Sequence, residues 1–419
     1  MPNHLTDQIM DSQFTVNTQE NSKGLFDCPG YKFSATAVDI RENQSGQLDI
    51  ALIVGNTPLK SAAVFTQNDV TAAPVDLCKA VLKGNPEKIG GIVINSGNAN
   101  ACTGNNGMAD AQEMSASAQV TTNIGLPFYV CSTGRIGRRL PIDKISAGID
   151  TCAKALKHCP TQALQASQAI LTSDTCEKLA TVTIQYQNKT FTLAGMAKGA
   201  GMIEPNMATM LAFIVTDLDG SHTSLQKCLS QANAQTFNCI SIDGDMSTND
   251  TVILLANGES GASIDEDPIL AQAFQEALTL ISEILAKKIV SDGEKITKVV
   301  TLAIKGCSTF DDAEKVARAI GNSLLVKTSF YGSDPNWGRV VDAAGYARVG
   351  LKLDQLNLHY NEVPALLSGI PQEHHADDWK AIAQKKSFTI TLDLNQGDQS
   401  FKLITTDLSE AYVDFNKSE

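Results

Sequence analysis

The sequence predicts an α/β fold in which helices and sheets form mixed layers. Along the chain, short apolar runs alternate with longer stretches of helical spacing, and two segments have the pattern of β-hairpins. The 419 residues, of which 43% are hydrophobic and 19% charged, are enough for a large core and two subdomains. Because hairpins accompany the helix–strand alternation, a simple doubly wound sheet is disfavoured.

The first half of the chain begins with a polar segment, residues 1–24, for which we expect a disordered tail. Short apolar runs bounded by turn residues then predict buried strands, and stretches of helical spacing, one of which closes on Gly125, predict helices. The predicted elements are strands at 90–95 and 126–132, helices at 109–125 and 143–157, and a hairpin at 178–195.

The second half continues with a strand that begins at Thr209, a long helix with proline at its start and a final hairpin that turns near Gly397. A C-terminal α/β subdomain is expected from about residue 298. The predicted elements are strands at 209–216, 238–245, 299–304 and 324–330, helices at 225–237, 268–290 and 311–321, and a hairpin at 387–408.

Composition limits the classes of partner. Lysine and arginine total 33 against 46 acidic residues, so the net charge is −13 and nucleic acid would meet net repulsion. No apolar run approaches the roughly 20 residues of a membrane helix, and the first residues lack the apolar core of a signal peptide. We therefore expect a cytoplasmic protein without a membrane partner. The ten cysteines form no C-x-x-C pair, which favours reduced thiols over disulfides or a metal site.

The segment KGAGMIEPNMATMLAFIVTD, residues 198–217, changes character at one bond. Up to Ala208 it has the composition of an irregular loop, and from Thr209 it is a short apolar run typical of a buried strand. The six histidines lie outside the glycine-rich and strand-end segments, which disfavours a Ser–His–Asp or Cys–His site. A threonine freed at its N-terminus needs no histidine, because its own α-amine acts as the base for its hydroxyl. The Ala208–Thr209 bond is a candidate for such a cleavage site.

Two glycine-rich turns follow predicted strands, at residues 95–104 and 132–137. Glycine allows backbone N–H groups to point at a ligand, which suits a phosphate cradle or an oxyanion hole, and plain tight turns have the same composition. Neither turn carries the lysine of a phosphate-binding G-K-[ST] loop. The acidic stretch 243–250 lacks the pattern of an EF-hand, so we expect no metal. Glu294 is either a ligand-facing carboxylate or a solvated turn residue.

Four ordered motifs resemble those of the ornithine acetyltransferase family, the bifunctional glutamate N-acetyltransferases of arginine biosynthesis: KGAGMIEPNMATML, STGRIG, FNCISIDGDMSTNDT and DPNWGR. The resemblance spans essentially the whole chain after the tail. It implies an N-terminal-nucleophile-type sandwich of the ornithine acetyltransferase/aminopeptidase kind with a smaller C-terminal α/β subdomain. It also implies a precursor that cleaves itself before a threonine into chains 25–208 and 209–419, which stay together, usually as a heterotetramer.

The same resemblance assigns the chemistry by position. Thr209 matches the nucleophile, Ala208 matches the last residue of the first chain, and Thr133 and Gly134 match the oxyanion-hole pair. The implied reaction is ping-pong: the Thr209 hydroxyl takes acetyl from N2-acetylornithine as an ester, ornithine leaves, and glutamate receives the acetyl group. We expect no cofactor, and acetyl-CoA stays open as an alternative acetyl donor.

Four further positions match residues that contact the amino-acid substrates: Thr172, Lys198, Glu294 and Asn416, the last of which closes the pocket in the family. Lys198 and Glu294 carry the charges needed to pair with the carboxylate and the ammonium of an amino acid. Each is also the kind of residue that forms surface ion pairs, which contribute only about 0–1 kcal/mol.

Several positions depart from the family pattern. Arg135 stands where a small or apolar residue is usual, Cys239 stands where arginine is common, and Lys295 and Ile296 replace glycine and alanine after the pocket glutamate. The chain also ends at Glu419, before the Thr or Ser with which the family completes its site. These departures leave donor and acceptor open. The alternatives are a family paralogue that acts on another N-acetylated amino acid, and an N-terminal-nucleophile amidase or aminopeptidase. A binding protein that stays uncut ranks behind both.

Overall fold

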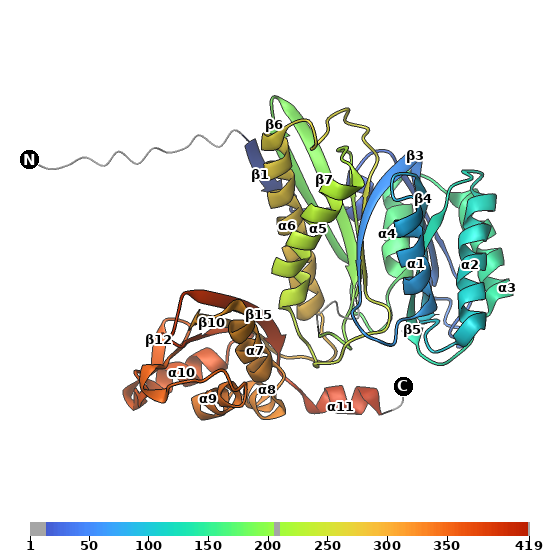
Figure 1. The fold of residues 1–419 in the computed structure, drawn as a ribbon. Coiled ribbons are helices and arrows are strands. Elements are labelled where there is room, and N and C mark those ends of the chain that lie inside the picture. Colours follow the sequence, from blue (N-terminus) through green and yellow to red (C-terminus); the bar gives the residue numbers. More distant parts are fainter. Residues whose placement is uncertain (1–13, 205–209, 418–419) are drawn as a thin grey trace, which may run out of the picture.

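The computed structural model describes residues 14–204 and 210–417, which form two parts (Figure 1). The larger part is a layered sandwich built on a nine-stranded sheet, and the smaller part is a C-terminal domain built on a six-stranded sheet. Both parts combine helices with strands, so the predicted α/β class with mixed layers is confirmed.

The large sheet has the strand order β1-β6-β7-β8-β9-β3-β4-β5, and β2 pairs with β3 beside this path. β8 runs parallel to β9 and β4 runs parallel to β5. The strands are β1 (Phe14–Thr18), β2 (Tyr31–Thr36), β3 (Ile50–Phe65), β4 (Ile89–Asn98), β5 (Phe128–Arg135), β6 (Lys178–Tyr186), β7 (Lys189–Lys198), β8 (Leu211–Thr216) and β9 (Thr251–Ala256).

The long strand β3 belongs to two layers of the sandwich. Its first residues pair with β2 and β4, and its last residues, from Lys60 to Phe65, pair with β9. The pairing with β4 shifts between Val54 and Leu59, where the strand passes from one layer to the other. A single buried core fills the space between the layers, with side chains such as Phe213 from β8 and Tyr129 from β5.

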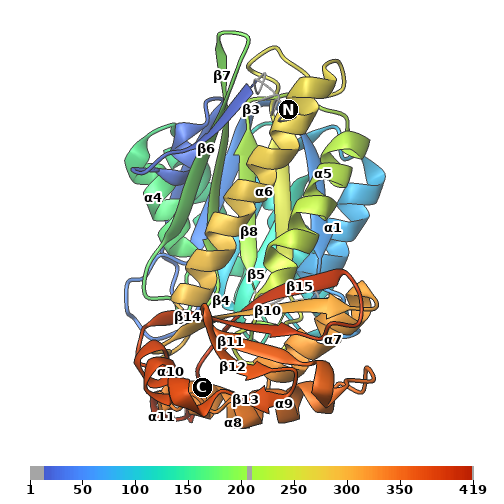
Figure 2. The same cartoon turned by 90° about the vertical axis from the view of Figure 1, so that its left-hand side faces the viewer.

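Helices cover both outer faces of this double layer. α5 and α6 pack on the face of β6 to β8, as Figure 2 shows, and α2 and α3 pack on the face of β4 and β5. α1 and α4 border the space between the layers, because Cys78 and Ala166 belong to its core. The helices of this part are α1 (Ala73–Gly84), α2 (Gly104–Thr121), α3 (Ile142–Ala155), α4 (Pro160–Ala169), α5 (His222–Gln235) and α6 (Pro268–Ser291), with 3-10 turns η1 (Gly24–Asp27) and η2 (Phe237–Cys239).

By length and composition alone, α6 is apolar enough to cross a membrane. Half of its most apolar window is buried within the structure, and side chains such as Phe274, Leu278 and Leu285 belong to the sandwich core. Asp267 caps its first turn by accepting hydrogen bonds from the N–H groups of Ile269 and Leu270. α6 is thus a core helix of the sandwich.

The C-terminal domain has the strand order β13-β12-β11-β14-β10-β15. An isolated bridge between Ile240 and Ile404 joins it to the sandwich, and Figure 1 shows α11 extending from it beneath β5. Its elements are β10 (Val299–Cys307), β11 (Asn357–Tyr360), β12 (Val363–Leu367), β13 (Ile370–Pro371), β14 (Ser387–Asp393), β15 (Gln399–Thr406), α7 (Phe310–Gly321), α8 (Leu324–Tyr331), α9 (Trp337–Gly345), α10 (Ala376–Ala383), α11 (Glu410–Asn416), η3 (Leu353–Gln355) and η4 (Glu373–His375).

Four predicted elements are wrong. Residues 14–18 of the expected disordered tail form β1, because they pair along the edge of β6. Residues 238–245 form none of the strands, and the next strand along the chain is β9. Residues 324–330 form the helix α8, which Ser323 caps. The final hairpin is two strands that both pair with β10, which lies between them.

Candidate functional site

The candidate site lies where the ends of β4, β5 and β7 meet the start of β8. Lys198, the last residue of β7, is the register partner of Leu211 in β8. Its ammonium group reaches the neighbouring layer and donates a hydrogen bond to the Thr133 hydroxyl, with an Nζ–Oγ1 distance of 3.2 Å. Both side chains are buried. Two residues assigned to the site from distant segments are therefore in direct contact.

The end of β5 has a backbone that only glycine fits. Gly134 has φ +129°, and a Cβ added there would lie 2.3 Å from the Gly97 carbonyl carbon and 2.6 Å from the Asn98 nitrogen. The approach is close because Gly97 and Gly134 are register partners. The neighbouring Thr133 oxygen accepts a hydrogen bond from Lys198, so its own hydroxyl hydrogen is free to point at a ligand. This turn is suited to stabilising an oxyanion.

Asp174 lies between two lysines at this site. Its Oδ1 is 2.6 Å from the Lys178 Nζ, its Oδ2 is 4.0 Å from the Lys198 Nζ, and its side chain has no exposed surface. Burial by itself raises the pKa of Asp174, but the charges of Lys198 and Lys178 outweigh it and lower the pKa to about 2. Burial lowers the pKa of Lys198, and the Asp174 carboxylate opposes that effect. Asp174 therefore helps to keep Lys198 charged.

The stretch 172–174 connects this cluster with Glu294. The backbone N–H and the hydroxyl of Thr172 contact the Asp174 Oδ2 at 3.1 and 3.5 Å. The Ser173 hydroxyl donates to the Glu294 Oε1 at 2.6 Å, and Asn416 of α11 donates to the other Glu294 oxygen at 3.1 Å. A continuous series of contacts thus joins all the predicted site residues that the structure describes.

Glu294 also fits closely against the glycine-rich segment that approaches the predicted cleavage bond. Its N–H donates to the Ala200 carbonyl at 2.8 Å. A Cβ added to Gly201 would come within 2.4 Å of the Glu294 carboxyl carbon. The backbone at position 201 thus passes directly beside the carboxylate, and a larger residue there would displace the end of the Glu294 side chain.

Ala208 and Thr209 lie outside the described residues, so their roles stay predictions. The description resumes at Met210, whose N–H donates to the Asp250 Oδ1 at 2.9 Å and whose carbonyl accepts from the Thr251 N–H at 3.1 Å. The residue that follows the predicted nucleophile is therefore fixed to the start of β9.

Asp250 is a buried carboxyl group that sequence reasoning missed. Its Oδ2 has no hydrogen-bond partner among the residues that the structure describes. Burial raises the pKa of Asp250 well above its ordinary value, and the hydrogen bond from Met210 and the charge of Lys198 oppose this only in part. Burial therefore shifts Asp250 towards its neutral, protonated form.

Asp174 and Lys178 were also missed as members of the site. The available signal was the position of Asp174 two residues after the substrate-type Thr172, and that of Asp250 near the end of a quoted family motif. At neither position does the local sequence pattern show whether the aspartate is a buried charge or a solvated turn residue. Some of the contacts that define both carboxyls come from segments elsewhere in the chain, the end of β7 for Asp174 and the residue before β8 for Asp250.

Three of the residues that depart from the family pattern, Lys295, Arg135 and Cys239, have side chains that take no part in the contacts described above. The exposed Lys295 places its Nζ 5.0 Å from the centre of the Phe415 ring, and it forms no ion pair with Glu294 within the described part of the chain. Arg135 is exposed at the end of β5. Cys239 packs against the core of the C-terminal domain. None of these three side chains forms an ion pair with Glu294 in the described part of the chain.

A model of the ArgJ family matches residues 32–418. The chain belongs to this family. It is 42% identical over 398 residues to the arginine biosynthesis bifunctional protein ArgJ of Geobacter sulfurreducens, a match that covers 92% of this chain and 98% of that protein. It is 39% identical over 391 residues to the protein of the same name from Symbiobacterium thermophilum, with 93% and 96% covered.

A solved structure of ornithine acetyltransferase from Mycobacterium tuberculosis, in complex with ornithine, is 34% identical to this chain with a TM-score of 0.40. The match covers 46% of this chain and 98% of that one. The family predicted from the motifs is confirmed by the ArgJ match, and the chain is an enzyme of that family.

Proposed function

We propose that the chain transfers acetyl from N2-acetylornithine to glutamate in arginine biosynthesis, through an acetyl ester on Thr209. The observation that carries this proposal is the contact of Lys198 with Thr133 at the end of the sandwich where β8 begins, in a chain of the ArgJ family. Relatives at about 40% identity are named bifunctional proteins of arginine biosynthesis.

In the first half-reaction the Thr209 hydroxyl oxygen attacks the acetyl carbonyl carbon, and the α-amine of Thr209 takes the hydroxyl proton. The Thr133 hydroxyl and the Gly134 turn stabilise the oxyanion. The bond from the acetyl carbon to the substrate nitrogen then breaks, the nitrogen takes the proton, and ornithine leaves. The amine of glutamate attacks the ester in the second half-reaction and restores the free Thr209.

Charge complementarity supports the choice of an amino-acid substrate. Lys198 is a buried cation that suits a substrate carboxylate, and Glu294 is an anion that suits the side-chain ammonium of ornithine. Lys295 stacks on Phe415 and leaves Glu294 free for this contact. The ornithine–glutamate pair is therefore preferred over a paralogue with a different substrate.

The substrate proposal is tested by measuring kcat/KM for N2-acetylornithine, acetyl-CoA and a panel of other N-acetylated amino acids, with and without glutamate. We expect N2-acetylornithine to exceed the panel by about tenfold or more, the discrimination available from one buried charge contact. Acetyl release should also depend on glutamate. Release at the same rate without an acceptor would instead identify an amidase, and a different leading donor would identify a paralogue.

We also propose that the precursor cuts itself between Ala208 and Thr209, and that the two products stay together as a heterotetramer in the cytoplasm. Denaturing mass spectrometry should give fragments that end at Ala208 and begin at Thr209. Thr209→Ala should stay intact because no hydroxyl is left to attack the Ala208 carbonyl, whereas the control Thr190→Ala, on the exposed end of β7, should be cut. Cleavage of Thr209→Ala would refute the assignment, and native mass spectrometry tests the assembly.

A further inference from the structure

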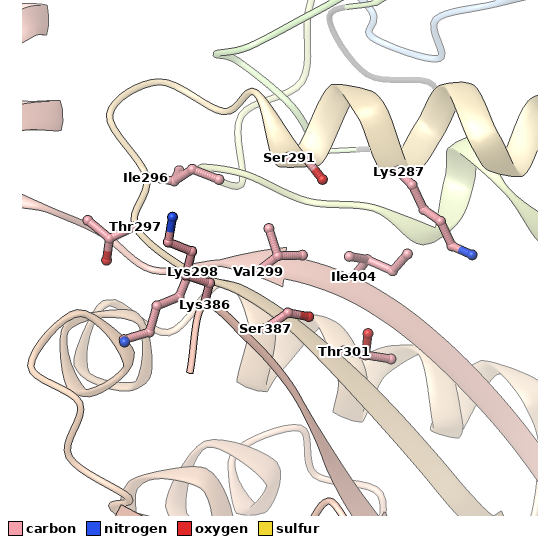
Figure 3. Close-up of a pocket in the computed structure, with 10 residues that line it drawn as sticks. All are labelled: Lys287, Ser291, Ile296, Thr297, Lys298, Val299, Thr301, Lys386, Ser387 and Ile404. Carbon is pink, nitrogen blue, oxygen red and sulfur yellow. The ribbon is translucent and has the colours of Figure 1, made fainter. Parts of the chain in front are cut away.

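A pocket of about 710 Å³ lies between the C-terminal end of α6 and the first residues of β10 and β14 (Figure 3). Ser291 comes from the last turn of α6, Lys298 directly precedes β10, Thr301 lies near the start of β10, and Ser387 begins β14. The pocket is therefore formed where the sandwich and the C-terminal domain meet. Its volume is within the range of small-molecule sites.

The charge of this pocket is positive, in a chain whose net charge is −13. Three lysines line it, Lys287, Lys298 and Lys386, and no acidic residue is among the lining residues that the structure describes. Glu283 pairs with Lys287 at 2.8 Å, but Lys402 shares the same carboxylate at 3.5 Å. The lysines that line the pocket thus outnumber the carboxylates that form ion pairs with them, and the excess charge favours an anion.

Lys298 is unlike the other buried lysines. Among the described residues four lysines are buried, and three have polar partners: Lys178 has two carboxylates, Lys198 has Thr133 and Asp174, and Lys327 has Thr405 and Thr406. Lys298 is 6% exposed, and its ammonium group has no hydrogen bond or ion pair with any residue of the described chain. Because it has no partner in the described chain, this ammonium group is available to a ligand in the pocket.

The candidate counter-ion for Lys298 is Asp407, whose carboxylate already has other hydrogen-bond partners. Asp407 accepts hydrogen bonds from the backbone N–H groups of Thr297 and Lys298 and from the Thr297 hydroxyl. It makes no ion pair with the Lys298 ammonium in the part of the chain that the structure describes. The cation that lines the pocket therefore lacks a protein anion.

We propose that this pocket binds a small anion with more than one carboxylate or phosphate group, and that Lys298 is its central contact. Lys287 and Lys386 supply further charge, and the hydroxyls of Ser291 and Ser387 can donate hydrogen bonds. A multivalent anion fits better than a single carboxylate because the lysines come from three separate elements. The site is separate from the catalytic one, although Lys298 follows Glu294 by only four residues.

Isothermal titration calorimetry of the full chain with citrate, and separately with diphosphate, tests the proposal. We expect saturable binding of at least one probe at millimolar concentration or below. Tighter binding of citrate would identify a polycarboxylate site, and tighter binding of diphosphate would identify a phosphate site. Equal affinity for both would show that the site recognises negative charge irrespective of the chemical group. Absence of binding by both probes would overturn the proposal.

The matched variants are Lys298→Met, Lys386→Met and the control Lys385→Met, an exposed lysine outside the pocket. Lys298→Met should weaken binding by about tenfold or more, and Lys386→Met less. Lys298→Met should keep the thermal midpoint of the wild type, because Lys298 has no partner to lose. Equal weakening in Lys385→Met, or unchanged binding in Lys298→Met, would overturn the assignment. Thr209→Ala should bind as the wild type does, so the test is independent of catalysis.

Discussion

Asp250 accepts its hydrogen bond from the N–H of the peptide unit that joins Thr209 to Met210. It is thus a positioning residue, one peptide unit from the predicted nucleophile. A neutral carboxylic acid can accept this bond and also donate one, which a carboxylate cannot do. A neutral Asp250 can therefore hold the start of β8 through two hydrogen bonds, one accepted and one donated.

Replacement of Asp250 tests whether its side chain positions the Met210 N–H as a neutral carboxylic acid or as a carboxylate. Asp250→Asn keeps an acceptor for the Met210 N–H and a donor, so cleavage and kcat should stay within a few-fold of the wild type. Asp250→Ala leaves that N–H without its partner, at a cost of about 1–3 kcal/mol, and cleavage should slow. Mass spectrometry over time measures both. Equal loss in the two variants would show that the charged form is needed.

The stability of Asp250→Asn should depend on pH in a defined direction. The folded pKa of Asp250 lies above its ordinary value of 3.8, so its stabilising effect is present below that value and is lost as the pH rises. Asparagine does not titrate. The thermal midpoint of the variant relative to the wild type should therefore increase from pH 4 towards pH 7. A difference that stays constant or decreases would contradict the raised pKa.

Asn416 reaches Glu294 from α11, and its loss should affect substrate binding. Asn416→Ala removes a hydrogen bond to a charged group, and we expect KM for N2-acetylornithine to rise by about tenfold with a smaller change in kcat. Val413→Ala, at an exposed position on α11, is the control. If both variants have the same KM, Asn416 has no role in the substrate pocket.

At the scale of elements, the close approach of β4 and β5 depends on Gly134. Gly134→Ala would drive a methyl group into the backbone of Gly97 and Asn98, at a cost of roughly 3 kcal/mol or more. Gly137→Ala is the control, because Gly137 also has a positive φ but nothing lies within 4 Å of an added Cβ. It should cost only about 1 kcal/mol. Thermal midpoints and acetyl transfer measure both, and similar values would contradict the close approach.

Strongly periodic elements could be predicted from the sequence, whereas pairing could not. α6 was expected at 268–290 and spans Pro268–Ser291, because its apolar spacing continues over many turns. Residues 387–408 have two alternating strands with a turn between them, which is also the pattern of a hairpin. β10, distant in sequence, lies between these strands and pairs with both. Local pattern does not contain that information.

The candidate site shows the same division. The site residues predicted from the family motifs lie together where the structure describes them. The motifs identified the family, and the fold of the family brings these residues together. The buried charges Asp174 and Lys178 were missed, because their role depends on burial and on each other. The apolar run 324–330 was misread for a related reason: its capping residue Ser323 begins a short helix, and strand-like composition gave no sign of it.

At the scale of the whole molecule, the site needs both parts of the structure. Lys198 and Thr133 come from the sandwich, Asn416 comes from the helix that ends the C-terminal domain, and Glu294 lies in the segment between α6 and β10. The same segment ends at the pocket around Lys298. Relative movement of the two parts would therefore alter both sites together.

The strand order gives the proposed cut an unusual consequence. β8 and β9, which follow the cut, lie between β7 and β3, which precede it. The second polypeptide would thus fill the middle of a sheet whose two sides belong to the first, and the β7–β8 and β3–β9 pairings would join the two polypeptides. The Ala208–Thr209 peptide bond, which links the two polypeptides while the sheet forms, no longer exists after the cut. Denatured mature enzyme should fail to regain its structure under conditions in which uncut Thr209→Ala recovers, so each molecule folds once and its working life is limited by its first unfolding.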